Sequence, residues 1–359
     1  MKRSISYLFL AAASLCGLAS AQTTAYTTPV GYVSVTCTNN ADTRVGLPLM
    51  PPAVAAAALT TNPVGGLLTV STAAFGTYAN THYVKFTGTG AASGKIYAIT
   101  ANTATTITID LNGDTLTAVS GDTFSVTAFW TLKTLFDPAL STNNPLTTQN
   151  GIVGSLTSLT GARRTQIYLP SSSSGTNLAS RVPFFIDLSS GTWKDTANLS
   201  IADAGGQQIW PDSSFIIRNP ASVTSPTTYV CSGEVDMGKV VIPLATRSGG
   251  LQDNHRALNR PVDVTLNQLN LAGTSAFVSS NGQLTGARRD LLLVWTGTRT
   301  INQAPTATYF FNSQTGTWNI PGSINDAGGA VIPAGSGILI KKYADSNGTT
   351  AFWTNTPSY

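Results

Sequence analysis

The stretch that decides the fold is LTGARR, at Leu159–Arg164, which stands again at Leu284–Arg289. Further motifs follow each copy in one order: a Phe pair, a Gly-Thr-Trp turn, an Asp-Ala-Gly-Gly turn and an apolar strand. The copies lie about 125 residues apart, and a repeated interval of this kind is the signature of an internal duplication. We therefore predict two copies of one structural unit. The matched segments are Phe184–Phe185 and Phe310–Phe311, Trp193 and Trp318, Asp203–Gly206 and Asp326–Gly329, and Phe215–Arg218 and Ile338–Lys341.

The duplication extends toward the N-terminus, but at a longer interval. Val45–Leu49 resembles Val240–Leu244, and these stretches lie about 195 residues apart, about 70 more than the other motifs. The difference predicts an insertion of that size in the first copy, at residues 53–124. Short β-branched and aromatic runs alternate there with Gly, Asn and Ser clusters, as strands and turns do. The five predicted strands are Leu67–Val70, Tyr83–Phe86, Lys95–Thr100, Thr105–Leu111 and Thr123–Phe129.

The composition favours an all-β fold. Charged residues make up 10% of the chain, against roughly 25% in average globular proteins, and a surface rich in Thr and Val suits sheets better than helices. We predict two related β-sandwich or barrel-like repeat units, the first of which carries a small inserted β-barrel-like domain. Helix is expected only as single turns at Ala53–Leu59, Thr131–Phe136 and Leu266–Leu271. The predicted segments are 22–52 with 125–226 for the first unit, 53–124 for the insert and 227–359 for the second unit.

The N-terminal residues predict export. A short positive region precedes an apolar run at Ile5–Leu18, and Ala19–Ala21 gives the small-residue pattern that a signal peptidase cuts. We expect a signal peptide at 1–21 and a mature chain from Gln22, in the periplasm, at the cell surface or outside the cell. No later stretch reaches about 18 consecutive apolar residues, so no membrane span is expected after cleavage.

Charge argues against nucleic acid as a partner. Cleavage of the signal peptide removes two of the 20 basic residues and leaves the 16 acidic residues, so the mature chain is nearly neutral. No run of Lys or Arg longer than two remains, whereas a phosphate backbone is tracked by a basic stripe. The two histidines lie far apart and no Cys-x-x-Cys motif occurs, so we expect no metal and no other cofactor.

Two cysteines, Cys37 and Cys231, remain in the predicted mature chain. In an oxidising compartment an even pair permits a disulfide. The alternative, which we weigh equally, is that both are buried as small apolar side chains.

Few groups could carry catalysis. Neither His82 nor His255 lies near a Gly-x-Ser-x-Gly motif, which leaves open only a triad around His255 with Asp253 or Asp263. Because a hydrolase signature is missing, we expect no enzymatic activity.

Acidic residues in turns are the other candidates for chemistry. Asp203 and Asp326 could act as paired carboxylates on a glycan, but each precedes Ala-Gly-Gly, which favours a turn held by the Asp side chain. Asp110–Asp114 has oxygen ligands at alternate positions, as in a calcium loop. Asn112-Gly113 between two predicted strands instead favours a type I′ hairpin turn.

Arginines and tryptophans that recur in both copies are the candidate binding residues. The pairs Arg163-Arg164 and Arg288-Arg289 could clamp carboxylate or phosphate groups, or could simply solvate the start of a strand. Trp193 and Trp318 could stack on sugar rings, or could complete the core of each copy. We favour the structural alternative for both sets.

Three short motifs of the chain are Pro29–Val33, Leu47–Leu49 and Trp130–Leu132. Together they resemble an uncharacterised family of exported bacterial β-rich proteins. Members begin the mature chain with a similar Pro-Val-Gly-Tyr-Val stretch and end in glycine-punctuated strands. The family has no assigned activity, so the resemblance implies export and β-structure and points to no catalytic residue.

The leading hypothesis is a non-catalytic structural protein of the envelope or extracellular space that assembles or adheres. The polar N-terminal segment from Gln22 leads into a strand at Tyr32–Thr36, which could add to an open sheet edge of another copy. The alternative is a surface protein that binds glycan or another acidic polymer, such as surface polysaccharide, through the recurring Trp and Arg residues. A polysaccharide-active enzyme is the third hypothesis.

Overall fold

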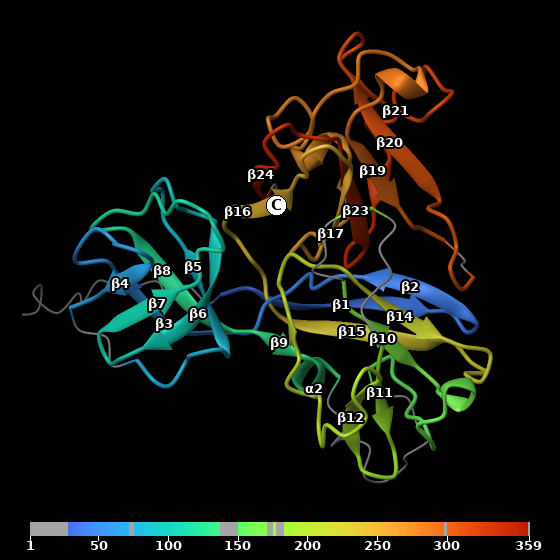
Figure 1. Cartoon of the computed structure of the whole chain (residues 1–359), viewed down its shortest axis with the longest axis horizontal. Helices are drawn as coiled ribbons and strands as arrows, with labels where there is room; N and C mark the ends of the chain where they lie inside the picture. The colour runs from blue at the N-terminus through green and yellow to red at the C-terminus, as the bar shows by residue number, and fades with distance from the viewer. Residues whose placement is uncertain are drawn as a thin grey trace, which may run out of the picture.

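The computed structural model describes residues 28–71, 75–136, 150–170, 175–176, 183–297 and 300–357. Within these residues, antiparallel strands make up nearly all the regular structure and helix is limited to single turns, which confirms the all-β prediction (Figure 1). Two predicted helical turns form, at α2 (Leu132–Leu135) and at the 3-10 turn Asn267–Leu269. The predicted signal peptide at 1–21 and the polar segment that follows it, up to residue 27, lie outside the described residues.

The first unit is built on a five-stranded antiparallel sheet in the order β12-β11-β10-β14-β2. Two short ribbons accompany the sheet, one of β1 with β15 and one of β9 with β13. Alternate residues of the sheet strands are apolar and point into one core. This alternation is expected because one face of an antiparallel sheet packs on the core while the other faces solvent. The strands are β1 (Val30–Cys37), β2 (Ala41–Val45), β9 (Trp130–Thr131), β10 (Gln166–Tyr168), β11 (Phe184–Asp187), β12 (Thr192–Asp195), β13 (Gln208–Ile209), β14 (Phe215–Asn219) and β15 (Thr227–Glu234). Because β15 pairs with β1 and its Tyr229 and Cys231 lie in this core, the first unit extends beyond the boundary predicted at residue 226.

The second unit has a five-stranded sheet in the order β17-β23-β19-β20-β21 and two ribbons, β16 with β24 and β18 with β22. It encloses a separate apolar core. The strands are β16 (Val240–Ala245), β17 (Gln252–Ala257), β18 (Val264–Thr265), β19 (Leu291–Val294), β20 (Ala307–Asn312), β21 (Thr317–Asn319), β22 (Val331–Ile332), β23 (Gly337–Lys342) and β24 (Thr350–Asn355).

The two units share one strand order when their strands are matched along the chain. Each LTGARR stretch forms a 3-10 turn before the middle strand of its sheet. The backbone N–H of Arg164 donates to Ser155 Oγ at 2.9 Å, and that of Arg289 donates to Ser280 Oγ at 2.9 Å. These matched details support the duplication, which stays a prediction about the origin of the chain.

One of the predicted matches is wrong. Val45 ends β2, which pairs with β14 inside the first sheet, whereas Val240 begins β16, which pairs with β24 outside the second sheet. In strand order, β16 corresponds to β1. Short apolar runs alternate in every half-buried strand, so this pattern does not distinguish one strand from another.

The insert is a six-stranded antiparallel sheet in the order β3-β8-β5-β6-β7-β4. All five predicted strands form. The predicted helical turn at Ala53–Leu59 is wrong, because Ala53–Ala58 is strand β3 and hydrogen bonds to β8 override the helix propensity of alanine. The other strands are β4 (Leu67–Thr69), β5 (His82–Phe86), β6 (Ile96–Asn102), β7 (Thr106–Ile109) and β8 (Thr123–Ala128).

The insert sheet is open rather than closed into the expected barrel. Its end strands β3 and β4 do not pair with each other in the described part of the chain. A backbone hydrogen bond links the two ends just beyond β3, from Thr60 N–H to Thr69 C=O at 2.9 Å. The sheet encloses a third apolar core of its own, around Phe86 and Phe124.

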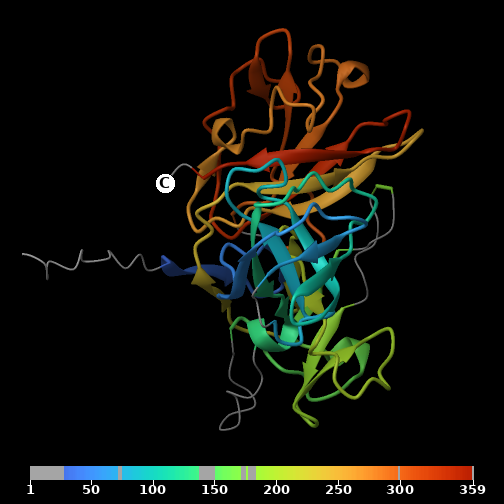
Figure 2. The same ribbon diagram turned by 90° about the vertical axis from the view of Figure 1, so that its left-hand side faces the viewer.

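The insert lies against the junction of the two repeat units (Figures 1 and 2). Its Gly94 carbonyl accepts a hydrogen bond from Val241 N–H of β16 at 2.9 Å. Lys85 of β5 forms an ion pair with Asp236, and both side chains are buried. Polar contacts therefore hold the insert against residues 236–241, at the start of the second unit, in addition to its chain connections to the first unit.

The two repeat units meet at the end of β2, where the backbone approach is very close. Gly46 N–H donates to Gly335 C=O at 2.9 Å. A Cβ added at Gly46 would stand 2.1 Å from the Cβ of Ala257. Only glycine fits between these segments without moving the backbone.

The substitution Gly46→Ala is therefore expected to lower the free energy of unfolding by about 1–3 kcal/mol, the usual cost of overpacking. Chemical denaturation of the purified protein measures this loss. The matched control is Gly161→Ala, where an added Cβ meets nothing within 4 Å. Equal stability of the two variants would contradict the close packing at this junction.

Candidate functional site

The recurring tryptophans do not form a binding surface. Trp193 is 0% exposed and Trp318 is 1% exposed. The Trp193 ring packs on Phe136 at 5.8 Å between centroids, and the Trp318 ring packs on Phe277 at 5.2 Å. The proposal that they stack on sugar is wrong, and the core alternative is confirmed.

Arg163 and Arg288, the first arginine of each pair, bind to groups of their own turns. Arg163 is buried, its guanidinium lies 4.9 Å from the Phe185 ring, and its Nε donates to the Ser158 carbonyl. In the second unit, Arg288 donates to Thr285 Oγ1 at 2.7 Å. The two pairs lie in separate units, and the structure does not form one anion clamp from them.

The remaining arginines of these pairs differ in their exposure. Arg289 is exposed and its guanidinium lies 4.3 Å from the Tyr343 ring, whereas Arg164 is half-buried. Matched positions in the two units thus have different surroundings. This difference fits a structural use of the pairs better than a shared binding role.

Cys37 and Cys231 are free, buried thiols in the described structure. They lie on the paired strands β1 and β15, but Cys231 faces Val33 and Cys37 faces Thr227. Four residues of strand separate the two positions, about 13 Å, whereas a disulfide needs Cα atoms within about 7 Å. The disulfide interpretation is therefore wrong, and burial raises the pKa of each thiol to about 11.

Asp203 and Asp326 hold turns, as the Ala-Gly-Gly context predicts. Oδ1 of Asp203 accepts from Gly205 N–H at 2.8 Å, and Oδ1 of Asp326 accepts from Gly328 N–H at 2.8 Å. Each belongs to a different unit, and the turn interpretation is confirmed.

His255 binds an arginine of the other repeat unit. Its Nδ1 accepts from Arg44 Nη1 at 2.7 Å. Burial, followed by the positive charges of Arg44 and Arg256, lowers its pKa to about 3, so the ring is neutral near pH 7. Asp253 lies 3.8 Å from Lys341, and Asp263 accepts from Ala334 N–H at 2.8 Å. His255 thus connects the two units through Arg44.

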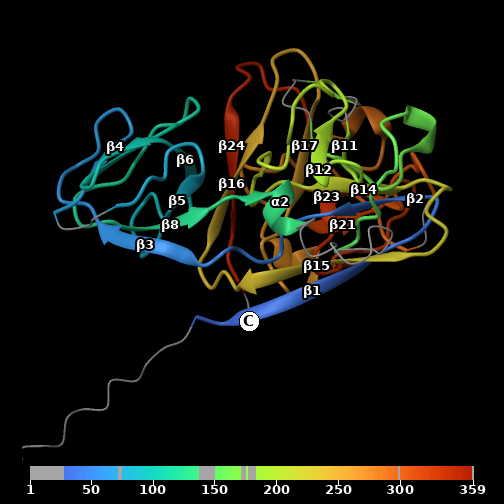
Figure 3. The ribbon, with the colours of Figure 1, turned by 90° about the horizontal axis from the view of Figure 1, so that it is seen from below.

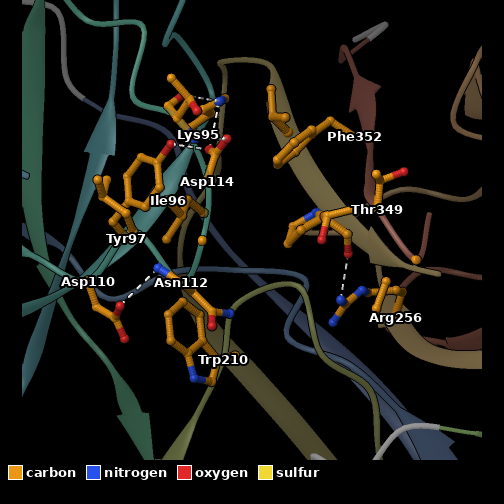
Figure 4. Close-up of a pocket in the computed structure, with 18 residues that line it drawn as sticks. Lys95, Ile96, Tyr97, Asp110, Asn112, Asp114, Trp210, Arg256, Thr349 and Phe352 are labelled. Carbon is orange, nitrogen blue, oxygen red and sulfur yellow. Dashed lines mark hydrogen bonds and ion pairs between the residues drawn. The ribbon is translucent and has the colours of Figure 1, made fainter. Parts of the chain in front are cut away.

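A cleft of about 580 Å³ opens where the insert faces the second unit (Figure 4). Strand β6 and the turn after β7, residues 110–115, form one wall, and β16, β24 and the loop before β24 form the other. Trp210 of the first unit completes the lining. Asn112 and Gly113 have φ angles of 45° and 80°, and Asp114 N–H donates to Leu111 C=O at 2.8 Å, so the predicted tight turn forms and presents its tip to the cleft. The prediction that it closes a hairpin is wrong, because β7 and the next strand, β8, do not pair with each other.

Charges in the cleft are compensated within its walls. Lys95 Nζ lies 2.7 Å from Asp114 Oδ2, and the Tyr97 hydroxyl donates to the same oxygen at 2.6 Å. Burial, and then the hydrogen bond to Asp114, raises the pKa of Tyr97. On the opposite wall, Arg256 lies 3.5 Å from Asp212. Asp110 is exposed and leaves one carboxylate facing solvent.

Sequence reasoning missed this cleft. It considered Asp110–Asp114 only as a turn or a calcium loop, and it did not consider Trp210 or Arg256. The lining residues come from all three parts of the fold, the insert, the first unit and the second unit, and are distant along the chain. The exposure of Trp210, at 39%, is the signal that sets it apart from Trp193 and Trp318.

Strand β1 is a second candidate, because one of its edges has no partner strand. Pro29 C=O accepts from Val235 N–H at 2.8 Å, so the odd-numbered residues of β1 exchange hydrogen bonds with β15. The N–H and C=O groups of the even-numbered residues then point away from β15. No described residue bonds to those outward groups, and Figure 3 shows β1 along the outer margin of the molecule. The outward residues are Val30, Tyr32, Ser34 and Thr36.

The end strands of the larger sheets are protected in ways that β1 is not. Strands β2, β12 and β17 carry charged side chains, β4 and β21 have three residues each, and β3 is bulged. These are recognised devices against edge pairing. Strand β1 has eight residues, VGYVSVTC, without charge, proline or bulge. Val30 and Tyr32 are 76% and 75% exposed on its open face.

Two further observations concern the described residues. No group of three His, Cys, Asp or Glu side chains gathers there as a metal site would need. None of the helices in this part of the chain is both long and apolar enough to cross a bilayer.

No protein-family model matches the chain, and no curated protein or solved structure is significantly similar to it. The resemblance to an exported β-rich family therefore stays a prediction.

Proposed function

We propose that this chain is an exported, non-catalytic structural protein of the envelope or extracellular space, and that it assembles through strand β1. The observation that carries the proposal is the open edge of β1, which is long, uncharged and partly apolar. Such an edge is a template for another strand. Export rests on the predicted signal peptide at 1–21.

The partner that fits this edge is β1 of a second copy. In the antiparallel register of greatest overlap, Val30 faces Thr36 and Tyr32 faces Ser34 of the other chain. All outward groups then pair, with about eight hydrogen bonds, and no like charges meet. The pairing is two-fold and closed, so it gives a dimer with a four-stranded ribbon rather than an open filament.

The sequence hypothesis has the segment from Gln22, with the strand at Tyr32–Thr36, add to an open sheet edge of another copy. In the structure this strand is already held by β15 over eight residue pairs. The proposal therefore uses the free side of β1, and the segment 22–28 is not needed for it.

A structural role also agrees with the contacts of the groups that were candidates for catalysis. Asp203 and Asp326 hold turns through Gly205 and Gly328. His255 joins the two units through Arg44. Each of these side chains has a stabilising partner that accounts for its position.

The variant Ser34→Pro tests the assembly. Proline removes an outward N–H and leaves the hydrogen bonds between β1 and β15 in place, because Ser34 does not exchange bonds with β15. Light scattering across a concentration series is expected to show a dimer for the wild type and at least a tenfold weaker dimer for the variant. The matched control, Ser34→Ala, keeps the N–H and should dimerise as the wild type does.

Two results would contradict the proposal. If the wild-type protein stays monomeric at millimolar concentration, the open edge of β1 does not pair with a second copy. A dimer that Ser34→Pro leaves unchanged is held by a different surface.

A further inference from the structure

Beyond this assembly role, we propose that the cleft between the insert and the second unit binds a short neutral saccharide, with Trp210 as its stacking surface. The proposal stands on the cleft alone and is independent of β1. Its volume of about 580 Å³ lies within the range of small-molecule sites.

Trp210 is the aromatic group that the cleft presents to a ligand. It is 39% exposed, unlike the tryptophans of the two cores, and it packs on buried Phe129 at 5.1 Å between centroids. Phe129 therefore supports the indole from one side while part of it stays open to the cleft. A supported, partly exposed indole is large, rigid and weakly hydrated, which suits the C–H face of a sugar ring.

Polar groups that line the cleft together with Trp210 match hydroxyl groups. Asp110 and Asn112 are exposed in the turn after β7, and both line the cleft with Trp210 (Figure 4). Oδ1 of Asp110 accepts from the backbone N–H of Asn112 at 2.9 Å, which fixes the carboxylate relative to the backbone of the turn. A carboxylate accepts and an amide both donates and accepts, so together they suit neighbouring hydroxyls.

The charge distribution selects a neutral ligand over an acidic one. Lys95 is paired with Asp114, and Arg256 is close to Asp212. The exposed carboxylate of Asp110 repels an anion. The sequence also suggested an acidic polymer as the ligand. Such a polymer would find each of these two cations of the cleft already beside a carboxylate.

The walls of the cleft are held in place before a ligand arrives. Val241 N–H donates to Gly94 C=O at 2.9 Å, and Lys95 Nζ lies 4.7 Å from the Phe352 ring. Asp345 holds the loop before β24 through Thr349 Oγ1 at 2.5 Å. A site organised in advance spends less free energy on ordering when it binds.

The experiment uses linear trisaccharides of glucose, mannose, galactose and N-acetylglucosamine as probes, with trigalacturonate as the acidic comparison. Binding to the full mature protein is followed by saturation-transfer NMR and by calorimetric titration. At least one neutral probe is expected to bind with a Kd of 10 mM or tighter, and at least tenfold more tightly than trigalacturonate.

Two variants locate the binding. Trp210→Ala should weaken the best probe at least tenfold, and Trp210→Phe should restore part of the loss. Asn112→Gly keeps the left-handed turn and removes the amide, so it should weaken binding even if Trp210→Ala fails to fold. The absence of binding by all four neutral probes, tighter binding of trigalacturonate, or unchanged affinity in Asn112→Gly would each overturn the proposal.

Discussion

Replacing Lys342 by Met is expected to lower the free energy of unfolding at pH 7 by about 3–5 kcal/mol, because it leaves a buried carboxylate without its cation. Asp290 is 0% exposed and forms an ion pair with Lys342, whose side chain is also buried. Burial raises the pKa of Asp290, and the charge of Lys342 acts against that rise. Denaturant unfolding followed by tryptophan fluorescence measures the loss.

The first unit supplies a control for this pair. At the matched positions, Thr165 Oγ1 donates to Asn219 Oδ1 at 2.7 Å, so a neutral hydrogen bond occupies the same place. The double variant Asp290→Thr with Lys342→Asn copies this arrangement. It should recover most of the loss, to within about 1.5 kcal/mol of the wild type. A double variant that is as unstable as Lys342→Met would show that charge pairing is not the reason.

Acid is expected to weaken the junction of the two repeat units through His255. The folded pKa is lowered to about 3, below the unfolded value of about 6.5. Between these values the unfolded chain binds the proton and the folded chain does not, so stability falls as the pH falls. At pH 4.5 the loss from this group is roughly 3 kcal/mol, at 1.36 kcal/mol for each pH unit.

The measurement compares the wild type with His255→Asn, which cannot titrate and keeps a hydrogen-bond acceptor for Arg44. Unfolding free energies are determined at pH 7.5 and pH 4.5 for both proteins. The wild type should lose roughly 3 kcal/mol more than the variant over this interval. If the two proteins had the same pH dependence, the pKa of His255 would be the same in the folded and unfolded chains. The ring would then be protonated in the folded protein at pH 4.5, against the account.

Local patterns in the sequence predicted most of the strands. All five strands expected in the insert form, because β-branched runs between Gly and Asn clusters specify strand and turn directly. The tight turn at Asn112-Gly113 followed from the same kind of signal. Strand β3 was missed because its alanines have no strand propensity and depend on pairing with β8.

The functional surfaces could be predicted only in part. The sequence suggested a strand near Tyr32, but not which of its edges stays open, since this depends on pairing with β15 nearly 200 residues later. Trp193 and Trp318 were candidate binding residues because they recur in both units. Recurrence is equally expected of core residues, and both side chains are buried. Trp210 does not recur, and it reaches the cleft only because the insert stands beside β16 and β24.

The central claim is that the outward side of β1 pairs with a second copy, and amide hydrogen exchange followed residue by residue tests it most directly. The amides of Gly31, Val33 and Val35 bond to β15 and should be protected at every protein concentration. The amides of Tyr32, Ser34 and Thr36 should exchange rapidly in dilute protein and become protected as the concentration rises. Rapid exchange of these three amides at all concentrations would contradict the account.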